Sequence, residues 1–257
     1  MALPRMLDFP MPRYPVAPSA VHETLARHVM PRGLPLVLDL VRSSGSFARD
    51  AATGDEFLDM ASFYGSNPLG YAHPGLRDAE TLERLAITSQ LKVGNPDLGS
   101  VYMAEFVETL AHTAAPPELP RYFVIEGGAL AVENAMKTAF DWKVQKSLAR
   151  GLGERGSQIL HFERAFHGRS GYTLSVTNTD PAKTQYFPKF DWPRIPAPAA
   201  RFPLSGGNLE ATLVAEAEAT RAIERAFDER TGAGTRGQSN FGKKRVFAGS
   251  VLVTLSV

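Results

Sequence analysis

The adjacent glycines Gly127 and Gly128 mark a place where the chain could bind an anion. They follow an apolar and aromatic run at residues 122–125, which predicts a buried strand, and they precede helical spacing that begins near Ala129. The first N–H groups of a helix have no internal partner, and the helix dipole favours negative charge there. Glycine lets an anion approach these groups closely, and the small Ala129 continues the opening. The pattern predicts either a phosphate site or a purely structural turn, which is common in α/β packing.

A second group of chemically useful residues follows the apolar run at residues 158–162, which predicts another strand. Phe166, His167, Gly168 and Arg169 come next, at the end of that strand, where open α/β sheets bind their ligands. An aromatic ring beside a histidine can stack on a flat conjugated ligand, and an arginine can bind a carboxylate through two hydrogen bonds. The alternative is structural: Phe166 in the core, His167 bonded to backbone and Arg169 on the surface.

The elements that must position these residues are predicted from periodicity and from turn residues. Prolines make residues 1–18 an extended arm, and alternation around a polar Asp and Gly turn predicts a hairpin within residues 37–60. Phe63 follows in a loop, where it could pack in a core or line a substrate channel. Apolar spacing predicts helices over residues 78–88, 101–112, 128–144 and 208–230. The order of strands and helices predicts an α/β fold with a mostly parallel sheet.

Composition narrows the classes of function. The 257 residues are 44% hydrophobic, enough for a sizeable core, and the formal net charge of +1 gives no basis for binding nucleic acid or a membrane. No run of eighteen apolar residues and no signal-peptide-like N-terminus is present, so we expect a soluble, cytoplasmic protein. The absence of cysteine excludes disulfides and thiolate chemistry, and we expect no metal site.

Residues 126–135 resemble the cofactor phosphate turn of class III (ω-) aminotransferases, which are pyridoxal-phosphate enzymes, and residues 165–172 match the loop that covers the cofactor ring in that family. The run from Gly127 to Lys143 is most similar to the lysine 6-aminotransferases within it. The resemblance implies the aspartate aminotransferase-like fold type I, with an incomplete large-domain sheet and a small N-terminal α+β segment. It also implies that Gly127, Gly128 and Ala129 bind the cofactor phosphate.

The same resemblance implies roles for the other site residues. Phe166 stacks on the pyridine ring, His167 shapes the same face, and Arg169 binds the carboxylate of lysine or 2-oxoglutarate. Phe63 lies in the loop that reaches the substrate pocket in relatives. The implied reaction transfers the ε-amino group of L-lysine to 2-oxoglutarate, and family active sites imply a homodimer. The alternatives are an ornithine- or 4-aminobutyrate-type ω-aminotransferase, or a catalytically inactive relative.

The cofactor chemistry also requires a lysine for the Schiff base and an acid facing the pyridinium nitrogen. Lys243 lies in the stretch Phe-Gly-Lys-Lys, which resembles the cofactor lysine segment of lysine 6-aminotransferases, and Asp228 resembles the pyridinium acid more faintly. The alternatives are an exposed basic turn and a helix end. We expect a chain shortened on its C-terminal side, with residues 1–75 as arm and small-domain segment, 76–230 as part of the cofactor domain, and 231–257 as a divergent tail.

Overall fold

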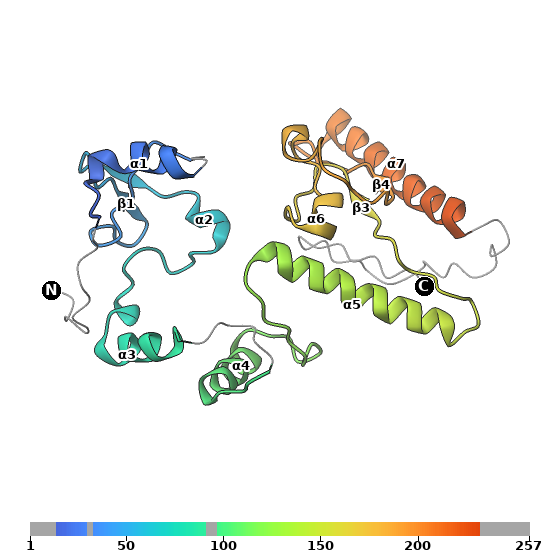
Figure 1. Cartoon of the computed structure of the whole chain (residues 1–257). Coiled ribbons are helices and arrows are strands. Elements are labelled where there is room, and N and C mark those ends of the chain that lie inside the picture. The colour runs from blue at the N-terminus through green and yellow to red at the C-terminus, as the bar shows by residue number, and fades with distance from the viewer. Residues whose placement is uncertain (1–13, 30–32, 91–96, 232–257) are drawn as a thin grey trace. The chain divides into compact units, whose positions relative to one another are not determined.

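The computed structural model describes residues 14–29, 33–90 and 97–231 (Figure 1). The chain divides into two compact units, Met1–Lys92 and Val93–Val257, and each is described by itself. The first unit therefore extends past the predicted boundary at residue 75 to include the following helix. The predicted division into domains stays a prediction.

The first unit contains short helices and one hairpin. Strands β1 (Phe47–Arg49) and β2 (Glu56–Leu58) pair antiparallel, with Phe47 opposite Leu58, and this confirms the hairpin predicted within residues 37–60. Asp78 caps the last helix of the unit because its carboxylate accepts the N–H of Thr81 at 2.9 Å. The helical elements are η1 (Pro18–Ala20), α1 (Val21–His28), α2 (Ser62–Gly65), η2 (Pro74–Leu76) and α3 (Ala79–Thr88).

The turn α2 has left-handed backbone at Ser62, Phe63 and Tyr64, with φ of 44°, 49° and 59°. This conformation costs non-glycine residues roughly 1–2 kcal/mol each. Asp59 holds the turn: its Oδ1 accepts the N–H groups of Ala61 and Ser62 at 2.9 and 2.8 Å, and its Oδ2 accepts the Tyr71 hydroxyl at 2.8 Å. These bonds lower the pKa of the Asp59 carboxyl, and the bond from the Ser62 N–H has the largest effect. The turn leaves Tyr64 fully exposed and Phe63 half-exposed.

The second unit is built around two long helices and a short parallel sheet. Strands β3 (His161–Phe162) and β4 (Arg194–Ile195) pair in parallel, with His161 opposite Arg194. In Figure 1 this sheet lies between α5 and α7; α7 contacts β4, and α5 contacts α6. The helical elements are α4 (Val101–Thr113), α5 (Gly128–Leu148), α6 (Gly171–Ser175), η3 (Pro181–Lys183) and α7 (Gly206–Thr231).

The core of the second unit lies on one face of α5. Met136 is buried there with Ile159, Val176 and Trp192, and Val132, Phe140 and Tyr172 pack against this cluster. Val132, Met136 and Phe140 follow the i, i+4, i+8 spacing that the helix pattern predicts for a buried face. The rings of Phe190 and Trp192 stack at 4.9 Å beside them. The core therefore fixes α5 against the segments that carry α6 and β4.

The sheet is much smaller than the sequence predicts. Residues 122–125 form no strand, and the Phe123 side chain is 69% exposed, so the predicted buried strand is wrong here. Of residues 158–162 only His161 and Phe162 are paired. A strand exists only when a neighbour accepts and donates its backbone hydrogen bonds. Within the described parts of the chain, no strand lies beside residues 122–125, and both sheets have two strands.

Candidate functional site

The start of α5 is open to a ligand. Gly127 has a φ of 86° and precedes the helix, and no side chain caps it. The first N–H with a helical partner is that of Ala131, which donates to the Gly127 carbonyl at 3.1 Å. The N–H groups of Gly128, Ala129 and Leu130 therefore emerge from the end of the helix. A Cβ added at Gly127 or Gly128 would meet no atom within 4 Å, so an anion has room to reach them.

Gly168 brings the second predicted loop against this helix start. Its φ is 122°, and a Cβ there would lie 2.5 Å from the Ala129 Cβ and 2.8 Å from the Ala129 Cα. These distances are shorter than any ordinary contact, so only glycine fits. The backbone of the loop therefore rests directly on the first turn of α5, and the two motifs that the sequence singled out meet.

The loop is held in shape by buried hydroxyl groups. Thr177, which is fully buried, donates its hydroxyl to the Gly168 carbonyl at 2.7 Å and accepts the N–H of His167 at 2.9 Å. Thr173, also fully buried, accepts the N–H of Ser170 at 3.0 Å and bonds the Ser170 hydroxyl at 2.8 Å. A loop with its backbone groups satisfied in this way keeps one conformation before any ligand binds.

The side chains predicted to contact a ligand lie on this loop. Phe166 is 54% exposed, so it is not part of the core and its ring is available for stacking. Arg169 is exposed, and no carboxylate within the described residues pairs with its guanidinium group. His167 is partly buried. Through the contact of Gly168 with Ala129, the structure brings the loop segment 166–169 next to the helix start at residues 127–129.

Glu133 connects the two parts of the site and was not predicted from the sequence. Its Oε1 accepts the N–H of Tyr172, in the first turn of α6, at 2.8 Å. Thr173 and Thr177 were missed as well. Only Thr173 has a local signal, because the spacing of Ser170 and Thr173 is that of a helix capping box, which the structure forms.

His161, the first residue of β3, lies buried next to the loop, at 3% exposure. Burial lowers the pKa of its imidazole to about 4, and the nearby charges of Arg194 and His167 act in the same direction. Hydrogen bonds with the backbone oppose this shift but are outweighed. The ring is therefore neutral at neutral pH. Its Nε2 accepts the Arg194 Nε–H at 3.3 Å, which requires the unprotonated nitrogen.

The remaining predicted residues lie elsewhere. Phe63 belongs to the first unit, where its ring meets that of Tyr71 edge-on at 6.4 Å. Asp228 is exposed near the end of α7, and its predicted role stays a prediction. Lys243 lies outside the described residues. No group of three or more His, Cys, Asp or Glu side chains in the described ranges could hold a metal ion, and none of their helices is long and apolar enough to cross a membrane.

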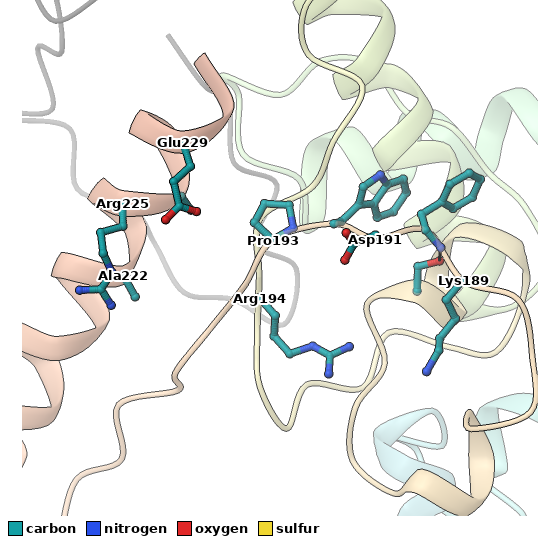
Figure 2. A pocket seen from close by; sticks show the side chains of 11 residues that line it. Lys189, Asp191, Pro193, Arg194, Ala222, Arg225 and Glu229 are labelled. Carbon is teal, nitrogen blue, oxygen red and sulfur yellow. Dashed lines mark hydrogen bonds between the residues drawn. The ribbon is translucent and has the colours of Figure 1, made fainter. Parts of the chain in front are cut away.

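A separate hollow of about 620 Å³ lies between α7 and the segment that leads into β4 (Figure 2). Its charged lining residues are of both signs: Lys189, Asp191, Arg194, Arg225 and Glu229. The hollow contains none of the predicted site residues. The start of α5 remains the better candidate because its open N–H groups, exposed ring and exposed guanidinium group together suit a planar anionic ligand.

Three comparisons with known proteins show what this chain is similar to. The family profile described as Aminotransferase class-III matches residues 29–233. An L-lysine-epsilon aminotransferase of Amycolatopsis lactamdurans is 50% identical over 229 residues, which are 86% of this chain and 50% of that protein. The solved structure of lysine aminotransferase from M. tuberculosis superposes with a TM-score of 0.78 at 50% identity, covering 84% of this chain and 49% of the other.

A more distant relative is a probable mitochondrial 4-aminobutyrate aminotransferase of Caenorhabditis elegans. It is 35% identical over 186 residues, which are 65% of this chain and 38% of that protein. The chain spans about half the length of the curated relatives that it matches at 50% identity.

Proposed function

This chain belongs to the class III aminotransferases, and from that premise we propose that it serves the pyridoxal-phosphate-dependent transfer of the ε-amino group of L-lysine to 2-oxoglutarate. The products are glutamate and 2-aminoadipate semialdehyde. The choice of lysine is supported by the 50% identity to L-lysine-epsilon aminotransferases. A 4-aminobutyrate-type donor is the less favoured alternative, since identity to such a relative is 35%.

The observation that carries the cofactor assignment is the close approach of Gly168 to Ala129. It supports the assignment because a helix start with open N–H groups lies next to a loop with an exposed aromatic ring, and pyridoxal phosphate is a phosphate attached to a flat ring. The N–H groups of Gly128, Ala129 and Leu130 would bind the phosphate, with Gly127 leaving them room. Phe166 would stack on the ring, and His167 would shape the same face.

When bound, the cofactor supplies a carbonyl that exchanges with amines and a conjugated ring that accepts electrons. The chain's own residues orient the reactants. Arg169 would bind the carboxylate of lysine and then that of 2-oxoglutarate through paired hydrogen bonds, so that both substrates present their reacting ends in the same direction. Lys243 would carry the cofactor, and Asp228 would keep the ring nitrogen protonated. Phe63 would line the substrate channel, and a cytoplasmic homodimer completes the proposal.

Substitution of Gly128 by aspartate tests the phosphate site. The new carboxylate would sit among the N–H groups that bind the phosphate and repel it. We expect the affinity of the 257-residue chain for pyridoxamine 5'-phosphate, measured by calorimetric titration, to fall at least about tenfold, which corresponds to ~1.4 kcal/mol. Gly207→Asp is the matched control, because it places the same side chain in the open first turn of α7. Equal affinities in both variants would show the phosphate assignment to be wrong.

Reduction of the pyridoxal-phosphate complex with borohydride tests whether the chain itself is catalytically competent. A Schiff base becomes a stable secondary amine on reduction, so peptide mapping identifies the lysine that formed it. We expect one labelled peptide, with the label on Lys243 and none after Lys243→Ala substitution. Labelling spread over several lysines, or absent, would favour a chain that binds the cofactor without turnover.

A further inference from the structure

We propose that Glu133 is a positioning residue that locks the ring-covering loop onto the helix that binds the phosphate. This inference rests on the proposed function of the site. Glu133 lies on α5, and its carboxylate reaches α6, to which the loop is attached. Its Oε1 accepts the N–H of Tyr172 at 2.8 Å, a bond between residues 39 positions apart in the chain.

The bond sits where it can control the loop. Tyr172 is in the first turn of α6, immediately after the loop residues Gly168, Arg169 and Ser170. Gly171 also faces the carboxylate, because a Cβ added there would lie 3.4 Å from Glu133 Oε1. The loop is thus held at two points, by the contact of Gly168 with Ala129 and by the carboxylate of Glu133. Two points of attachment fix its orientation relative to α5, whereas one would allow rotation.

The N–H groups at the start of α6 already have side-chain acceptors. Glu133 accepts the N–H of Tyr172, and the Ser170 hydroxyl accepts the N–H of Thr173 in the capping box. The start of α5 has no side-chain cap, so its N–H groups stay open to the phosphate.

Hydrogen bonds within the loop make this attachment effective. Thr177 and Thr173 tie Gly168 and Ser170 to the segment that contains α6. Movement of α6 would therefore carry Phe166 and Arg169 with it. We expect loss of the Glu133 bond to displace the whole loop and to leave the start of α5 intact.

The test uses the 257-residue chain and two probes, pyridoxamine 5'-phosphate and inorganic phosphate. Glu133→Ala removes the acceptor, Glu133→Gln keeps an oxygen at the same distance, and Asp141→Ala removes an exposed acid from the same helix as a control for net charge. We expect Glu133→Ala to weaken binding of pyridoxamine 5'-phosphate about tenfold, from the loss of one hydrogen bond to a charged group. Inorganic phosphate should bind within about twofold of the unsubstituted chain, because its site on α5 is unchanged.

Glu133→Gln and Asp141→Ala should both keep the affinity for pyridoxamine 5'-phosphate within about twofold, since each retains the acceptor for Tyr172. A readout without any ligand is the hydrogen exchange of the Tyr172 amide, which should be about tenfold faster in Glu133→Ala and nearly unchanged in Glu133→Gln. A general loss of structure would instead weaken the binding of both probes.

The outcomes separate this inference from the proposed function. If Gly128→Asp abolishes binding of pyridoxamine 5'-phosphate and Glu133→Ala leaves it unchanged, the cofactor site stands and the role of Glu133 is refuted. If the unsubstituted chain binds neither probe, the proposed function fails and the inference fails with it. If Glu133→Gln loses as much affinity as Glu133→Ala, the attachment through the Tyr172 N–H is wrong.

Discussion

Gly168→Ala is expected to destabilise the second unit by roughly 3 kcal/mol or more and to abolish binding of pyridoxamine 5'-phosphate. The new methyl group would lie 2.5 Å from the Ala129 Cβ and 2.8 Å from its Cα, so the loop or α5 must move. The φ of 122° at Gly168 adds backbone strain for any residue with a side chain. Denaturant unfolding and calorimetric titration would measure the two effects.

Gly153→Ala is a control that introduces backbone strain without a steric clash. Gly153 also has positive φ, 75°, but a Cβ there would meet no atom within 4 Å. We expect Gly153→Ala to cost only about 1 to 2 kcal/mol and to leave ligand binding unchanged. A Gly168→Ala chain that unfolds at the same denaturant concentration as Gly153→Ala would show that the loop does not rest on α5 as described.

The second large effect is a loss of folding stability at acidic pH, caused by His161. The pKa of His161 is lowered to about 4 in the folded chain, chiefly by burial, whereas the ordinary pKa of histidine, 6.5, applies in the unfolded chain. Well above pH 6.5 the imidazole is neutral in both states and contributes no pH dependence. As the pH falls from 6.5 towards 4, the unfolded chain binds a proton that the folded chain does not, so stability decreases, and below about 4 the loss levels off. We expect a loss of roughly 2 to 3 kcal/mol between pH 7 and 4.5 from this residue.

His161→Gln isolates that contribution because glutamine can still accept the Arg194 Nε–H and cannot be protonated. The free energy of unfolding at pH 7 and pH 4.5 should differ less in this variant than in the unsubstituted chain, by about the same 2 to 3 kcal/mol. His112→Gln is the surface control, since His112 is exposed and pairs only along its own helix with Glu108. Identical pH profiles for all three chains would contradict a neutral, buried His161.

Much of the local structure followed from the sequence. The hairpin, α3, α4, α5 and α7 could be predicted because each leaves a pattern among residues close in the chain. In α5 that pattern is the spacing of Val132, Met136 and Phe140. Strands were predicted less well, because a strand depends on partners distant in the chain. Residues 122–125 have the composition of a buried strand, and within the described parts of the chain they meet no neighbour to pair with.

The candidate site shows the same division. The residues around Gly128 and Phe166 were predictable because glycine, aromatic and arginine side chains have distinctive chemistry, and because their order resembles a known family. Glu133 and Thr177 were not, since a single glutamate on a helix and a threonine after a short helix are ordinary surface residues in sequence. Only folding shows that one bonds Tyr172 across the site and that the other is fully buried beneath Gly168.

The backbone contact between Gly168 and Ala129 also limits how this protein can be recombined with its relatives. Removing the Ala129 methyl group would still leave its Cα 2.8 Å from a Cβ at position 168, so no change at one position makes room for a side chain at the other. A chimera with a crossover point between them would join a loop and a helix shaped for different neighbours. Residues 127–178 are therefore best exchanged as one block.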